Sequence, residues 1–122
     1  MTRGQRGQAT LEVALALPVI TVVALAVVQV GVVARDRVAL VHAAREAIRT
    51  AIVDPGPAGV TAAARAATSL DPSRLSVEVV GGAESGDPVR VNVRYRCRTD
   101  VAVVGPLLPD LELSEAFSAV VE

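Results

Sequence analysis

The chain has 122 residues, which is enough for one small domain and a short appendage. Its formal charge is −1 at pH 7, which excludes a whole-chain basic field for nucleic acid, and its 2% aromatic content requires an aliphatic core. A single cysteine, Cys97, excludes an intrachain disulfide and any paired-cysteine metal or redox site.

The longest apolar segment runs from Val13 to Ala34 and contains 22 residues without a charge. As a helix rising about 1.5 Å per residue it would be roughly 33 Å long, enough to cross a bilayer core of about 30 Å. The segment is apolar on all sides, which is typical of a helix in lipid or inside an assembly. We expect a membrane-spanning helix. The alternatives are the core helix of a soluble domain and a secretory signal cut at the weak site Val32-Val33-Ala34.

Two features stand in front of this segment: an acid, Glu12, and a tripeptide Arg-Gly-Gln that occurs at residues 3–5 and again at 6–8. An acid near the end of a membrane helix costs less than one at its centre, and it can face the positive helix terminus. That explains why Glu12 is tolerated. It does not explain the wider pattern from Arg6 to Pro18, which reads RGQATLEVALALP.

This pattern resembles the type IV prepilins, and most closely the TadE-like minor pseudopilins of tight-adherence (Flp) pilus systems. The resemblance implies that a prepilin peptidase cuts after Gly7, which makes Gln8 the first mature residue and Glu12 the fifth. Cutting after Gly4 would instead make Ala9 the fifth residue. Only the second copy of the tripeptide therefore fits the family pattern.

The same resemblance suggests roles for two residues of the helix. Cleavage would free an α-amino group at Gln8, and Glu12 of a neighbouring subunit displaced by about one turn could pair with it. We therefore expect Glu12 to set the register of assembly. Pro18 matches a proline of the family's opening segment, and it is expected to kink or loosen the helix near Ala14.

Helical periodicity continues beyond the apolar segment. A stripe at steps of three and four residues predicts the buried face of a helix that runs from about residue 9 to 52: Val38, Val41, Arg45, Ile48 and Ile52. The lone histidine, His42, is expected on its surface. Asp54-Pro55-Gly56-Pro57 ends this helix. A second helix is predicted over about residues 58–69, with an apolar face that packs on the first: Val60, Ala63, Ala67 and Leu70.

The remaining sequence has the two-residue period of strands. Strands are predicted over residues 76–80, 89–97 and 113–121, with a glycine-rich hairpin loop over 81–88. In the second strand, alternate residues are expected to face inward: Val89, Val91, Val93, Tyr95 and Cys97. In the third, Leu113, Phe117, Ala119 and Val121 are expected inward, and Glu115 interrupts their alternation.

The predicted fold is therefore α+β: a long N-terminal transmembrane helix that continues into a small pilin-like head with a second helix and a three-stranded antiparallel sheet. We expect a prepilin leader over residues 1–7, a transmembrane and assembly helix over 8–34, and an extracytoplasmic head over 35–122.

The outward face of the second strand carries a row of basic residues: Arg90, Arg94, Arg96 and Arg98. A solvated sheet face and a docking surface for an acidic partner subunit both fit this row. Nucleic-acid binding fits less well, because stacking aromatic residues are absent and acids lie nearby. Cys97 is expected to be a small apolar strand residue, with an intermolecular disulfide or lipid attachment as alternatives.

No catalytic constellation, phosphate-binding glycine loop or metal cluster is recognisable in the sequence. We therefore expect a non-enzymatic subunit without cofactor, metal, small-molecule substrate or nucleic acid. The resemblance implies a structural subunit that supports assembly of a tight-adherence type IV pilus or a related secretion filament. Its implied partners are the membrane, the prepilin peptidase, the major Flp-type pilin, other pseudopilins and the platform membrane protein of the pilus machine.

The direction of insertion does not follow from charge. Two arginines precede the apolar segment and four follow it within about 15 residues, so the rule that basic flanks stay in the cytoplasm favours a cytoplasmic head. The resemblance implies the opposite, a single-pass inner-membrane protein with a cytoplasmic N-terminus and the head outside. Two alternatives remain: an uncleaved anchor that scaffolds another envelope complex, and a secreted binding domain released near Ala34.

Overall fold

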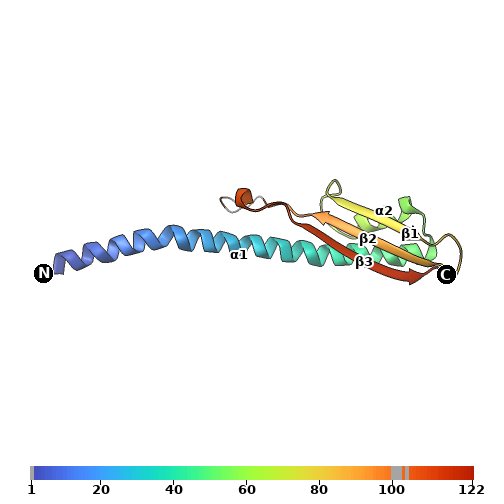
Figure 1. The fold of residues 1–122 in the computed structure, drawn as a ribbon, viewed down its shortest axis with the longest axis horizontal. Helices are drawn as coiled ribbons and strands as arrows, with labels where there is room; N and C mark the ends of the chain where they lie inside the picture. Colours follow the sequence, from blue (N-terminus) through green and yellow to red (C-terminus); the bar gives the residue numbers. More distant parts are fainter. Residues whose placement is uncertain (1, 100–102, 104) are drawn as a thin grey trace. The chain divides into compact units, whose positions relative to one another are not determined.

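The computed structural model describes residues 2–99, 103 and 105–122. The predicted α+β fold is confirmed: a long helix, α1 (Thr2–Val53), precedes a second helix, α2 (Pro57–Ala66), and a three-stranded antiparallel sheet (Figure 1). The chain divides into two units, Met1–Val32 with Thr99–Pro109, and Val33–Arg98 with Asp110–Glu122. The predicted head, 35–122, differs from the second unit chiefly in including residues 99–109, which contain the short 3-10 helix η1 (Gly105–Leu107).

In the first unit, α1 is apolar and largely exposed. The helix begins at Thr2 rather than near residue 9, so both Arg-Gly-Gln tripeptides are helical. By length and composition α1 can cross a membrane, and only 6% of its most apolar window is buried. The Thr21 hydroxyl is satisfied within the helix, because it donates a hydrogen bond to the Leu17 carbonyl at 2.9 Å. Gln29 is buried, with 3% of its surface exposed.

The second unit contains the sheet. Its strands are β1 (Leu75–Gly81), β2 (Pro88–Arg96) and β3 (Glu112–Val120), with β2 in the centre. The three predicted strands are therefore confirmed, and each predicted end lies within one residue of the observed end. Residues of β2 alternate between the core and the surface, and its buried members are Val89, Val91, Val93 and Tyr95. Cys97 is also buried, but it lies just after the end of β2.

The helix face beneath the sheet is made of small residues. The predicted stripe is correct only in part, because Val38 is 59% exposed and Arg45 is exposed. Val41, Ile48 and Ile52 are half-buried, and Ile48 packs against the core. The buried hydrophobic residues of α1 in this unit are Leu40, Ala43, Ala44, Ala47 and Ala51. Alanine lets a helix and a sheet approach closely, so the alanine face packs on the sheet and the larger β-branched residues lie at its margins. His42 is exposed, as expected.

Helix α2 is shorter than predicted and presents a slightly different face. Its buried residues are Val60 and Ala64, whereas Ala63 is half-buried and Ala67 is exposed beyond the end of the helix. The helix lies against β1 and joins the same core as the alanine face of α1. Pro57 starts it at a position where the missing N–H has no helical partner to lose.

The acid that interrupts the alternation of β3 has a structural partner. Glu115 stands opposite Val93, whose side chain faces the core, so its own side chain points toward the helix side of the sheet. There its carboxylate accepts a hydrogen bond from the Arg37 guanidinium at 2.9 Å. Glu115 therefore keeps the two-residue period and joins β3 to α1.

The hairpin between β1 and β2 needs glycine at two adjacent positions. Gly81 and Gly82 both have positive φ angles, 82° and 78°. A methyl group on Gly82 would lie 3.0 Å from a Pro55 carbon and 3.1 Å from carbons of Val89 and Val121. Gly82 thus allows the end of α1, the hairpin and the end of β3 to meet at one point.

Replacing Gly82 with alanine is expected to destabilise the head by about 2 kcal/mol, because the new methyl group combines backbone strain with crowding. Gly59→Ala is the matched control, since an added methyl there meets nothing within 4 Å and alanine favours a helix. Thermal unfolding of the full chain in detergent, followed by circular dichroism, should show a lower Tm for Gly82→Ala alone. Equal Tm values for both variants would contradict this account of the hairpin.

Candidate functional site

The expected cleavage segment is exposed helix. Gly4, Gly7 and Gln8 are all exposed, and a methyl group added at either glycine meets nothing within 4 Å. Gly4 and Gly7 are therefore both accessible in this structure. The distinction between them rests on their distance from Glu12.

Glu12 lies on α1 one helical turn after Gln8, so the two residues lie on the same side of the helix. Its side chain is exposed, and within the described part of the chain no basic group lies at ion-pair distance from it. In a low-dielectric environment the charge of Glu12 needs a partner. That partner must therefore come from another molecule or from an α-amino group that cleavage would free at Gln8.

Pro18 lies inside α1, and the helix continues on both sides of it. Proline has no N–H, so the carbonyl of Ala14 lacks its usual helical donor. The expected kink at this position stays a prediction.

Apolar side chains surround this part of the helix. The large exposed hydrophobic residues between positions 11 and 30 are Leu11, Val13, Leu15, Leu17, Val19, Ile20, Val22, Val23, Val27, Val28 and Val30. They occupy every side of the helix rather than one stripe. A surface of this kind is expected to be covered by lipid or by neighbouring helices.

In the head, the structure brings three of the four predicted docking arginines together. Arg90, Arg94 and Arg96 project from the exposed face of β2. Arg98 lies beyond the end of β2, near Asp71, and does not continue this row. The predicted row of four is therefore a row of three on the sheet.

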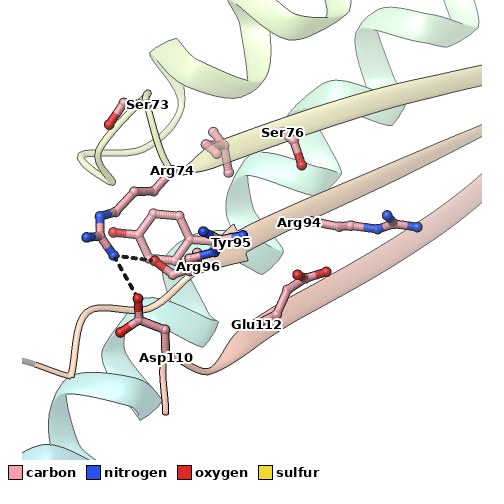
Figure 2. Close-up of a pocket in the computed structure, with 9 residues that line it drawn as sticks. Ser73, Arg74, Ser76, Arg94, Tyr95, Arg96, Asp110 and Glu112 are labelled. Atoms are coloured by element: carbon pink, nitrogen blue, oxygen red, sulfur yellow. Dashed lines mark hydrogen bonds and ion pairs between the residues drawn. The ribbon is translucent and has the colours of Figure 1, made fainter. Parts of the chain in front are cut away.

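A hollow lies at one end of this face, between the start of β1 and the start of β3 (Figure 2). Here the Arg74 guanidinium donates to the Arg96 carbonyl at 3.3 Å and lies 4.0 Å from the Asp110 carboxylate. In Figure 2 Arg94 extends away from this pair, along the sheet. Arg74 is therefore engaged in holding the loop ends, whereas Arg94 remains directed at solvent.

The turn before β1 is held by an acid. The Ser73 hydroxyl donates to Asp71 Oδ1 at 2.7 Å, and the Ser73 N–H donates to the same oxygen at 3.0 Å. These two hydrogen bonds hold the pKa of Asp71 below its ordinary value. They fix the turn that leads Arg74 to Asp110.

One buried cluster was not expected from the sequence. Asp36 on α1 is only 5% exposed, and its negative charge acts on Tyr95 and Cys97. Burial, followed by this charge, raises the pKa of Tyr95 and raises the pKa of the Cys97 thiol to about 11. The missed signal is that Asp36 precedes Leu40 by four residues and so belongs to the buried face of α1.

Comparison with known proteins bears on the N-terminal part of this arrangement. Residues 7–49 match the family model described as TadE-like protein. The resemblance to the TadE-like family is confirmed. No curated protein and no solved structure matches the chain.

The TadE-like match has informative limits. It begins at Gly7, the residue expected to end the leader, and it contains Glu12 and Pro18. It covers less than half of the chain and ends before the sheet. The TadE-like similarity therefore concerns α1, and the arginines of β2 lie outside it. Among the described residues, no group of three or more His, Cys, Asp or Glu side chains could hold a metal ion.

The Cys97 thiol should be unreactive while the head is folded. A pKa of about 11, against 9.0 for an ordinary thiol, predicts alkylation by iodoacetamide at pH 8 about 100-fold slower than in the denatured chain. Because the folded-state pKa is raised, burial of the neutral thiol contributes stability fully below about pH 9 and loses it as the pH rises through 11.

Mass spectrometry of timed alkylation reactions measures both rates. A cysteine introduced at Ser85, which is exposed, provides the matched fast-reacting control in the folded chain. Alkylation of Cys97 as fast as that control would contradict its burial.

Proposed function

We propose that this chain is a TadE-like minor pilin or pseudopilin, a structural subunit cut by a prepilin peptidase after Gly7 during assembly of a tight-adherence (Flp) pilus or a related secretion filament. The observation that carries the proposal is the family match that starts at Gly7 and includes Glu12. The match supports involvement in Tad pilus assembly. The processing site and the subunit's place are our own inferences.

The exposed surface of α1 supports a membrane stage before assembly. One apolar helix near the N-terminus fits a single-pass protein of a pilus system. We propose a cytoplasmic N-terminus in the inner membrane with the head outside, because the peptidase must reach Gly7 from the cytoplasmic side. On assembly, the same apolar surface would pack against helices of the major pilin and other pseudopilins.

Glu12 would set the axial register of that packing. Cleavage creates a positive charge at Gln8, one turn before Glu12 on the same side of α1. If neighbouring helices are displaced by about one turn, the amino group of one subunit meets the carboxylate of the next. Since a buried charge without a partner is strongly destabilising, registers that miss this pairing would be disfavoured.

Two other functions remain as alternatives, and one observation weighs on them. A secreted binding domain would require cleavage near Ala34, which lies in the middle of α1 with helix on both sides. Gly7 lies inside the same helix, so this observation weighs equally on both proposed cleavage sites. An uncleaved anchor that scaffolds another envelope complex agrees equally well with the helix, and the mature N-terminus distinguishes it from a pilin.

The proposed role is structural. Its partners would be the peptidase, the major pilin, other pseudopilins and the platform protein of the pilus machine. The proposal involves no enzymatic step of the subunit's own, and it requires no cofactor, small-molecule substrate or nucleic acid.

The doubled tripeptide allows a sharp test of processing. Gly7→Leu should abolish cleavage in a host with an active prepilin peptidase, because a side chain at the cut position would not fit a narrow cleft. Gly4→Leu makes the same change in the first copy and should leave cleavage intact. The measurement is the mass and N-terminus of the protein from its native host, allowing for cyclisation of Gln8. If the chain without substitutions kept an intact N-terminus in this host, the pilin proposal would be contradicted.

A second test concerns Glu12. Glu12→Gln keeps the size of the side chain and removes its charge, so cleavage should continue while recovery in the filament fraction falls at least about tenfold. Glu46→Gln, on the head part of α1, is the matched control and should assemble normally. Quantitative immunoblots of sheared filaments and membranes measure the distribution. Normal assembly of Glu12→Gln would remove Glu12 from the mechanism.

A further inference from the structure

The exposed face of the sheet has a hollow between two arginines. It measures about 390 Å³, and we call it the arginine hollow; it is lined by Val80, Arg90, Asn92, Arg94, Ser114, Glu115 and Ala116. The two guanidinium groups stand four residues apart on β2, about 13 Å along the strand. Their neighbours on β3 are short, because Arg90 is opposite Ser118 and Arg94 is opposite Ser114. The long arginine side chains therefore extend beyond the short serine side chains beside them.

The positive charge in this hollow is not neutralised locally. Within the described part of the chain, neither Arg90 nor Arg94 lies within 4.0 Å of a carboxylate. Glu115 lines the hollow, but its carboxylate is bound to Arg37. The Glu78 carboxylate, on the neighbouring strand, accepts a hydrogen bond of 3.4 Å from Asn92. The hollow thus offers two guanidinium groups to an incoming anion.

The opposite charge collects at the end of the head where α1, the β1–β2 loop and the C-terminal residue meet. We call this the acidic end; its acids are Asp54, Glu84, Asp87 and Glu122. Backbone hydrogen bonds hold these segments together, from Glu122 N to the Ile52 carbonyl at 2.9 Å and from Gly86 N to the Val121 carbonyl at 2.8 Å. Figure 1 shows this end of the sheet beside the C-terminus.

Two acids of the acidic end accept hydrogen bonds from loop backbone N–H groups, and the other two do not. Asp54 accepts a hydrogen bond from the Gly56 N–H at 3.0 Å, and Asp87 accepts one from the Glu84 N–H at 3.0 Å. These bonds fix the loop on which Glu84 stands. In the described structure the carboxylates of Glu84 and Glu122 are exposed and make no hydrogen bond or ion pair.

We propose that the arginine hollow of one copy receives the acidic end of a second copy, with the Glu84 carboxylate between Arg90 and Arg94. The hollow runs along the exposed face of the sheet from Arg90, three residues after Asp87, whereas the acidic end lies at the tip of the sheet, so each copy carries one surface of each kind. Such a head-to-tail contact repeats along a row rather than closing into a pair. This inference rests on the proposed function, because it supposes that copies of the subunit meet in one assembly.

The shape and the surroundings of the hollow favour this occupant over a polyanion. Glu78 and Glu112 project from the same face of the sheet and would repel a chain of phosphates or sulfates. A single carboxylate meets two arginines and one nearby acid, Glu78, so the local charge still favours it. The loop is also held in place before binding, which reduces the entropy lost on association.

Cross-linking of full-length chains in membranes tests the contact. One chain carries Ser85→Cys at the acidic end and another carries Ser114→Cys in the hollow, and a short bismaleimide is added at neutral pH. Cys97 stays native because it is buried and its thiol stays protonated. Within one copy the two new cysteines cannot react together, since Ser114 lies seven residues, or about 23 Å, from the end of the sheet where Ser85 stands.

A mixture of the two chains should give cross-linked dimers, and each chain alone should not. Arg94→Glu in the Ser114→Cys chain, or Glu84→Arg in the Ser85→Cys chain, should lower the dimer yield roughly tenfold, and combining both reversals should restore it. Arg65→Glu on the exposed side of α2 changes the net charge equally and should have no effect.

Three results would overturn the inference: no dimer in the mixture, a yield that the reversals leave unchanged, or cross-links from the hollow to a different protein only. The mature N-terminus is measured in the same samples. A Gln8 start without dimers refutes this contact and leaves the proposed function in place, whereas an uncut chain refutes the proposed function.

Discussion

The core that α1 shares with the sheet is built on a face of alanines. A helix that carried leucine at Ala43, Ala44 and Ala47 would hold the sheet farther away, and β2 could not bury its valines against it. The small face also explains how a chain with one phenylalanine, one tyrosine and no tryptophan builds a core. The core here is built mainly from aliphatic side chains, many of them small, rather than from large aromatic ones.

The same helix changes character along its length. Eleven large hydrophobic residues of its N-terminal part are exposed, and each would gain about 2 kcal/mol on full burial. Together that is on the order of 20 kcal/mol, more than the whole stability of an ordinary domain. The N-terminal part of α1 therefore requires lipid or neighbouring helices, whereas the head part is already covered by the sheet and α2. One helix thus connects an exposed apolar segment to a head whose core includes the C-terminal part of the helix.

The sequence could predict most of the architecture because its periods are clear. Apolar and polar residues of β2 alternate from Val89 to Arg96, and Asp54-Pro55-Gly56-Pro57 marks the end of α1. The buried face of α1 was predicted only in part because alanine gives a weak hydrophobic signal, so the bulkier Val38 was chosen over Ala43. The partner of Glu115 could not be predicted, because Arg37 is 78 residues away in sequence and meets it only in the folded head. For the candidate cleavage site the sequence carries more than the structure does, since both glycines lie in exposed helix and only their distance from Glu12 differs.

The two proposed electrostatic contacts differ in their surroundings, and this difference gives them separate tasks. A carboxylate at Glu12 among apolar helices acts in a low dielectric, where an ion pair is strong, salt has little access and a missing partner is costly. The arginine hollow faces water, where each pair contributes little and salt screens it at a distance of about 10 Å. The first contact can therefore discriminate between axial registers of the helix. The second can guide the approach of a head and then release it, so an assembling subunit could sample positions by its head before its helix is fixed.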